Sequence, residues 1–174
     1  GGSSEFFINM NPKDIPPKEH EDRGDFVRRE KKKCREGITI GGIWIPGRLY
    51  YFLNYHKMTI DILEKGTGEI LRKVANPLLR DNDWEIFENY EQAQKDKEVF
   101  LIGSGRQVGK SQILSALTTY EINLKPNAEA LLLFTNSADK ETVVKIILTA
   151  MKDGEKFMYL PNIDNDWKKT QIRF

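Results

Sequence analysis

The chain has 174 residues, 30% of them charged and 39% hydrophobic, and its formal net charge is +1 at pH 7. This composition is that of an ordinary globular protein, and it excludes a uniformly basic surface, so any contact with nucleic acid has to be local. The single cysteine, Cys34, excludes a disulfide framework, and no apolar run reaches the length of a membrane span, so we expect an intracellular protein in a reducing compartment.

Residues 1–37 predict an extended arm followed by a charged helix. Three prolines in the arm favour extended backbone, because proline fixes φ and restricts the residue before it. The charged segment, residues 22–35, contains six closely spaced basic residues, Arg28, Arg29, Lys31, Lys32, Lys33 and Arg35. Such a run fits a solvated helix face, which is its more common meaning, or a contact with DNA or a procapsid.

Residues 38–78 predict a small β-structured subdomain, since aromatic and β-branched residues alternate there with glycine and proline turn signals. Residues 61–75 have the pattern of a hairpin, with its turn at residues 65–68. We expect the aromatic side chains to fill a core rather than to stack on bases; they are Trp44, Tyr50, Tyr51, Phe52 and Tyr55. His56 is a lone histidine beside them, and we assign it a structural role.

A helix follows over residues 83–93, where Trp84, Phe87 and Tyr90 recur on one side. Residues 99–111, VFLIGSGRQVGKS, then run from an apolar segment through a glycine-rich turn into Gly-Lys-Ser. This order predicts a strand, a phosphate-binding loop and the start of a helix.

The chemistry of a bound polyphosphate explains the residue types in this loop. Glycines let successive backbone N–H groups face an anion, and the N-terminus of the following helix adds positive potential. Lys110 has the reach for the β- and γ-phosphates, and the Ser111 hydroxyl is the expected ligand of a magnesium ion. The first glycine of the G-x-x-x-x-G-K-[ST] pattern is replaced by Ser104. The candidate nucleotide-binding residues are Ser104, Gly105, Arg106, Gln107, Val108, Gly109, Lys110 and Ser111.

The segment Ser-Gly-Arg-Gln-Val-Gly-Lys-Ser resembles the phosphate loop of the large terminase subunits, the DNA-packaging motors of tailed bacteriophages. The Gly-x-Trp-Ile-x-Gly segment that begins at Gly42 is similar to the region ahead of the ATPase core in the same family. The resemblance implies ATP and Mg²⁺ as cofactors and Lys110 and Arg106 as catalytic residues, with Arg106 as an arginine finger acting in cis. An arginine at this position is also compatible with a simple salt bridge to a neighbouring carboxylate.

The resemblance further implies an α/β fold of the P-loop NTPase (RecA-like) type, with part of a parallel sheet and its helices, preceded by a small α+β subdomain. The domains would be an arm and charged helix at 1–37, the aromatic-rich subdomain at 38–78, and the start of the ATPase domain at 79–174. The implied partners are double-stranded viral DNA, a portal protein, a small terminase subunit and further copies in a ring. The implied location is the host cytoplasm.

Beyond the loop, residues 112–124 predict a helix, 130–134 a strand buried on both faces, and 139–152 a second helix that ends before Gly154. Strand, helix and strand would form a right-handed βαβ unit, and a side chain at 135–137 would cap the second helix.

The acids that P-loop enzymes use to hold magnesium and orient water are not found where expected, because the 130–134 segment ends in Thr135 and Asn136. In the terminases these acids and a nuclease centre lie further along the chain, so we expect the N-terminal part of a motor, with little ATP turnover of its own. The adenine pocket also lacks its usual glutamine at the start of the 83–93 helix, which leaves residues 76–84 as a weak candidate.

Two other functions fit the sequence. One is a non-catalytic docking module in which the loop is a structural turn and the arm and aromatic subdomain bind a partner. The other is a helicase-like P-loop NTPase with a divergent loop. Nucleotide binding separates the docking module from both enzymes.

Overall fold

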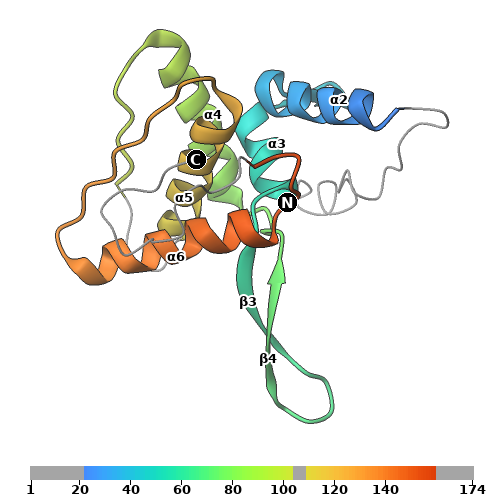
Figure 1. Cartoon of the computed structure of the whole chain (residues 1–174), viewed down its shortest axis with the longest axis vertical. Coiled ribbons are helices and arrows are strands. Elements are labelled where there is room, and N and C mark those ends of the chain that lie inside the picture. Colours follow the sequence, from blue (N-terminus) through green and yellow to red (C-terminus); the bar gives the residue numbers. More distant parts are fainter. Residues whose placement is uncertain (1–21, 104–108, 160–174) are drawn as a thin grey trace. The chain divides into compact units, whose positions relative to one another are not determined.

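The structure is a computed structural model, and it describes residues 22–103 and 109–159 (Figure 1). Over these ranges it combines five helices with two antiparallel two-stranded sheets, so the chain has a mixed helical and β composition. The described residues fall into two compact units. The first runs up to His56 and continues over Asn76–Lys110, and the second contains Lys57–Ala75 and the described residues from Ser111 onward. No helix in the described ranges has both the length and the apolar character needed to cross a bilayer.

In the first unit, helix α2, Arg23–Glu36, confirms the predicted charged helix. Asp22 caps its N-terminus, because the Asp22 carboxylate accepts the Gly24 N–H at 3.2 Å. Glu30 and Cys34 are buried on the inner side of the helix, so one stripe of this charged segment faces the protein.

Strands β1, Ile38–Ile40, and β2, Ile43–Ile45, form a short antiparallel hairpin after α2. The two glycines between them both have positive φ, the conformation that tight two-residue hairpin turns require. The Trp44 indole N–H donates to the Glu36 carbonyl at 3.3 Å. This bond ties the hairpin to the end of α2.

The segment after β2 is a helix, which corrects the β-structure predicted for it: α3 spans Gly47–Asn54. Seven of its eight residues are buried, and the helix packs on α2 and on helix α4, Asp81–Asp96. The Phe52 and Phe87 ring centroids are 5.1 Å apart across the α3 and α4 contact. Burial on both sides therefore outweighs the β preference of the aromatic residues, which depends on packing more than on the backbone.

Helix α4 confirms and extends the helix predicted at 83–93. Phe87 is fully buried on its inner side, as the apolar spacing predicts. Arg48 of α3 and Glu91 of α4 form a buried ion pair with a nitrogen to oxygen distance of 2.8 Å. Lys97 ends the helix in the left-handed conformation.

In the second unit, strands β3, Met58–Leu63, and β4, Ile70–Ala75, form the predicted hairpin with its turn at residues 65–68. Asp61 lies opposite Arg72, and their side chains form an ion pair at 3.2 Å. Helix α6, Ser137–Asp153, packs beside β3, and the two strands continue past it as a long ribbon (Figure 1).

Helices α5, Lys110–Leu124, and α6 also agree with the sequence analysis. Each buries an apolar stripe, which contains Ile113 and Leu117 in α5 and Val143 and Ile147 in α6. The Asn136 side chain accepts the Asp139 N–H at 2.8 Å, so a residue of the 135–137 group caps α6 as predicted.

The two strands predicted at 99–102 and 130–134 are not formed. Val99 is 85% exposed and Leu131 is 83% exposed, whereas buried strands were predicted. A parallel strand is stable when it pairs with other strands and when helices cover both faces of its sheet. Neither segment pairs with a strand among the described residues, so the predicted βαβ unit and parallel sheet are not seen there.

Candidate nucleotide-binding site

The described end of the predicted phosphate loop is a sharp turn into α5. Gly109 has φ +72°, in the left-handed region that glycine adopts without steric cost. Lys110 and Ser111 are the first two residues of α5, and both are exposed. The first N–H groups of a helix lack intrahelical acceptors and carry positive potential, which is the environment that an anion requires.

The remaining predicted loop residues lie outside the described residues, so their predicted roles stay predictions. They are Ser104, Gly105, Arg106, Gln107 and Val108.

Arg80, which the sequence analysis did not single out, lies against this turn. A Cβ atom added to Gly109 would be 2.5 Å from Arg80 Nη2 and 2.6 Å from Nη1, so the guanidinium packs directly on the Gly109 backbone. The φ angle of Gly109 is what favours glycine here, and a larger residue would also oblige the Arg80 guanidinium to move.

Asp83 holds the Arg80 guanidinium in place. Arg80 Nη2 donates to Asp83 Oδ1 at 2.7 Å, and Arg80 Nε donates to Asp83 Oδ2 at 3.1 Å. The Asp83 side chain is only 2% exposed, while the Arg80 side chain is 47% exposed. A two-point bond to a buried carboxylate fixes the plane of the guanidinium and leaves part of it open to solvent beside Gly109.

The start of α4 explains why Asp83 is fixed. Its carboxylate also accepts a hydrogen bond from the Arg80 backbone N–H at 3.1 Å, which is the return bond of a capping box. The positive end of the helix dipole further stabilises an acid in the first turn. An acid three residues after the N-cap is the sequence signal that indicates this capping bond. The sequence offers residues 76–84 only as a base pocket, where glutamine is the expected residue, and so it gives Arg80 no predicted role.

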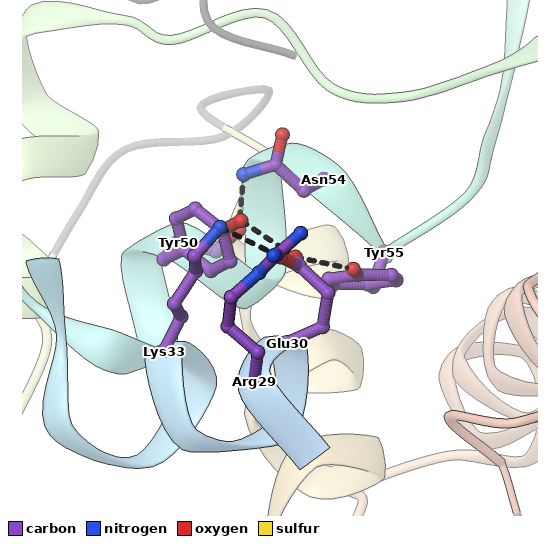
Figure 2. A network of polar contacts seen from close by, with 6 residues as sticks. All are labelled: Arg29, Glu30, Lys33, Tyr50, Asn54 and Tyr55. Carbon is purple, nitrogen blue, oxygen red and sulfur yellow. Dashed lines mark hydrogen bonds and ion pairs between the residues drawn. The ribbon is translucent and has the colours of Figure 1, made fainter. Parts of the chain in front are cut away.

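A second polar cluster involves the charged helix and the aromatic subdomain (Figure 2). Glu30 is 1% exposed, and its Oε2 accepts hydrogen bonds from Tyr50 Oη and Tyr55 Oη, each at 2.7 Å. Lys33 Nζ donates to Glu30 Oε1 at 2.6 Å. Burial, and next the hydrogen bond to Glu30, raise the pKa of both tyrosines well above the ordinary value.

This cluster is a packing device between α2 and α3. Arg28 and Lys32 form exposed ion pairs with acids of the same helix, which fits a solvated helix face, whereas the Arg29 and Lys33 side chains are only 23% exposed and pair with the buried Glu30. Cys34 is buried and forms no disulfide among the described residues, and burial raises the pKa of its thiol, so the thiol is unreactive.

The aromatic residues of the subdomain fill a core, as predicted. Tyr50, Tyr51, Phe52 and Tyr55 are buried, whereas Trp44 is partly exposed and lies under Lys95, whose Nζ is 4.9 Å from the ring centroid. His56 is buried and stacks on Phe52, which confirms its structural assignment.

Comparisons with known proteins give no match: no family model, curated protein or solved structure is significantly similar to the chain. In residues 22–103 and 109–159, no group of three or more His, Cys, Asp or Glu side chains is suited to hold a metal ion. Ser111 stays the predicted magnesium ligand.

Proposed function

We propose that this chain binds ATP with magnesium at the turn that ends in Gly109, Lys110 and Ser111, as part of a DNA-packaging motor of the large terminase type. The observation that carries the proposal is the left-handed Gly109, placed directly before a helix that starts with a lysine and a hydroxyl residue. This combination of turned backbone, cation and metal ligand suits a bound polyphosphate.

The residues around the turn fit an anion. In the proposed complex, Lys110 binds the β- and γ-phosphates, Ser111 ligates magnesium, and Arg106 neutralises charge that develops on the phosphates. Arg80 adds a second guanidinium next to Gly109, held by Asp83 and partly open to solvent. A magnesium ion held by Ser111 would supply further neutralisation of the phosphate charge.

The motor assignment extends this site by resemblance. A packaging motor couples ATP hydrolysis to translocation of double-stranded DNA, and its implied partners are a portal protein, a small terminase subunit and further copies of the chain. A helicase-like NTPase would share the nucleotide site and would differ in these partners.

A docking module is the second candidate, and one observation favours it. The apolar segments 99–102 and 130–134 form no parallel sheet among the described residues and expose Leu101 and Leu133, and exposed apolar side chains serve as contact surfaces. In that case the turn at Gly109 would be structural.

Nucleotide titration tests the proposal. We expect a fluorescent ATP analogue to bind the wild-type chain in the presence of magnesium, and Lys110→Ala to weaken binding by at least about tenfold, the loss expected for a hydrogen bond to a charged group. Lys145→Ala, which removes an exposed lysine of α6, is the matched control and should leave affinity unchanged. Equal affinity for the Lys110→Ala variant would favour the docking module.

A further inference from the structure

The β3 and β4 ribbon ends in uncovered apolar pairs. Ile62 lies opposite Leu71, and Leu63 lies opposite Ile70, next to the turn. Leu63 is 67% exposed and Ile70 is 69% exposed. The ribbon therefore exposes apolar side chains on both of its faces, because neighbouring residues of a strand point to opposite sides.

The ribbon also has two unpaired edges within the described residues, since β3 and β4 pair only with each other there. An isolated two-stranded hairpin is marginally stable in water, and an exposed apolar edge is a template for another strand. Helix α6 packs beside β3, where Met58 and Ile60 are partly buried, but the residues from Asp61 to the turn are exposed.

At both edges of the ribbon, the outward-facing backbone N–H and C=O groups include those of charged residues. The Glu64 backbone N–H donates to the Glu69 carbonyl at 2.9 Å. Hydrogen-bonded pairs occur at every second position of an antiparallel ladder, so the backbone groups of Ile62 and Leu71 also bond to each other. The neighbouring pair, Asp61 and Arg72, is therefore a non-hydrogen-bonded pair, and its backbone N–H and C=O groups point away from the partner strand, toward the two outer edges of the ribbon.

The two edges carry opposite charges. Strand β3 contains Asp61 and no basic residue, whereas β4 contains Arg72 and Lys73 and no acidic residue. Opposite charges on directly facing residues stabilise a strand pair, and like charges destabilise it. Pairing β3 with a second β3, or β4 with a second β4, would bring like charges together.

We propose that β4 of one copy of this chain pairs antiparallel with β3 of a second copy, through the ribbon edges. Repeating the register within the ribbon places Arg72 opposite Asp61 of the next copy. The same register sets Leu71 beside Ile62 and Ile70 beside Leu63, so both apolar pairs continue across the contact. The contact joins two different edges, and such head-to-tail contacts build rings or open chains. It requires no nucleotide.

Charge reversal tests the contact. Asp61→Arg makes both edges basic, and Arg72→Asp places an acid on each edge. We expect the wild-type chain to self-associate in sedimentation velocity runs, and each variant to associate about tenfold more weakly. Circular dichroism should show that each variant retains its helices.

Mixing the two variants separates the contact between copies from the ion pair within one copy. The arginine introduced on β3 of the Asp61→Arg variant would face the aspartate introduced on β4 of the Arg72→Asp variant. The reverse contact joins the unchanged Arg72 of the first variant to the unchanged Asp61 of the second, so the mixture should associate as the wild type does. Mixing cannot restore the broken pair inside each ribbon.

A double variant with both reversals should also associate as the wild type does, because its two edges again carry opposite charges. A wild-type chain that stays monomeric at all concentrations would overturn the proposal. Single variants that associate like the wild type, or a mixture that stays monomeric, would each overturn it as well.

Discussion

The guanidinium of Arg80 packs on the backbone of Gly109, so closely that a Cβ atom on Gly109 would be 2.5 Å from Arg80 Nη2. This contact joins the start of α4 to the turn before α5. The buried carboxylate of Asp83 holds the Arg80 guanidinium in place. The guanidinium therefore lies beside the turn at which we propose that phosphate binds.

Gly109→Ala should destabilise the fold. Alanine at φ +72° is strained, and its methyl group would oblige the Arg80 guanidinium to move, so we expect the free energy of unfolding to fall by about 1–3 kcal/mol in urea titrations. Gly103→Ala is the matched control, because a Cβ at Gly103 meets nothing within 4 Å. Equal stability of the two variants would contradict the left-handed conformation of Gly109.

Arg80→Ala should reduce both stability and nucleotide affinity. It leaves the buried Asp83 carboxylate without its cation, and because Arg80 is about half exposed we expect a cost of about 1–2 kcal/mol in the free energy of unfolding. Affinity for ATP should fall about tenfold by the loss of a charge-assisted contact.

Two further variants refine this prediction. Arg80→Lys retains a cation but cannot form the two-point bond to Asp83, so it should recover only part of the lost affinity. Arg28→Ala removes an exposed arginine of α2 and should change affinity little. An Arg80→Ala variant with wild-type affinity would remove Arg80 from the proposed site and leave Lys110 as its cation.

Glu30→Gln should loosen the packing of α2 on α3. The carboxylate accepts two tyrosine hydroxyl groups and a lysine, and glutamine presents an N–H₂ group to some of these donors (Figure 2). We expect the free energy of unfolding to fall by about 1–3 kcal/mol. Glu85→Gln changes an exposed acid of α4 outside the network and serves as the control.

The same network predicts lower stability at high pH. The pKa values of Tyr50 and Tyr55 are raised in the folded chain, so the unfolded chain loses these protons first, near pH 10. Their stabilisation is complete below the unfolded pKa and is lost progressively as the pH rises above it. Urea titrations between neutral and strongly alkaline pH should show a steeper loss for the wild type than for a Tyr50→Phe, Tyr55→Phe double variant. Parallel curves would contradict the raised pKa values.

ATP turnover by this chain should be negligible even if ATP binds. The residues after the 130–134 segment are Thr135 and Asn136, neither of which has a carboxylate that could hold magnesium. The Asn136 side chain instead caps α6. A phosphate-release assay at saturating ATP measures this directly. Steady hydrolysis, abolished by Lys110→Ala, would show that another acid serves.

The elements that the sequence predicts correctly are those with local signals. The turn at 65–68, the cap at Asn136 and the apolar spacing of α4, α5 and α6 are each encoded within a few residues. The 99–102 and 130–134 segments depend on distant strand partners, which no local pattern supplies. The helix at Gly47–Asn54 depends on burial between α2 and α4, and so its aromatic residues were interpreted as β-structure.

The candidate site also has one part that local sequence predicts and one part that depends on contacts between distant residues. The Gly-Lys-Ser pattern locates the turn at Gly109, because φ and helix start are local properties. The approach of Arg80 to Gly109 joins residues far apart in the sequence, so spacing alone did not predict it.

The most direct test of ATP binding at this turn is an amide NMR titration of the isotope-labelled chain with magnesium and ATP. We predict saturable shifts at Gly109, Lys110 and Ser111 that disappear in the Lys110→Ala variant, while Lys145→Ala behaves as the wild type. Unchanged amides at these three residues under saturating nucleotide would contradict the proposed function.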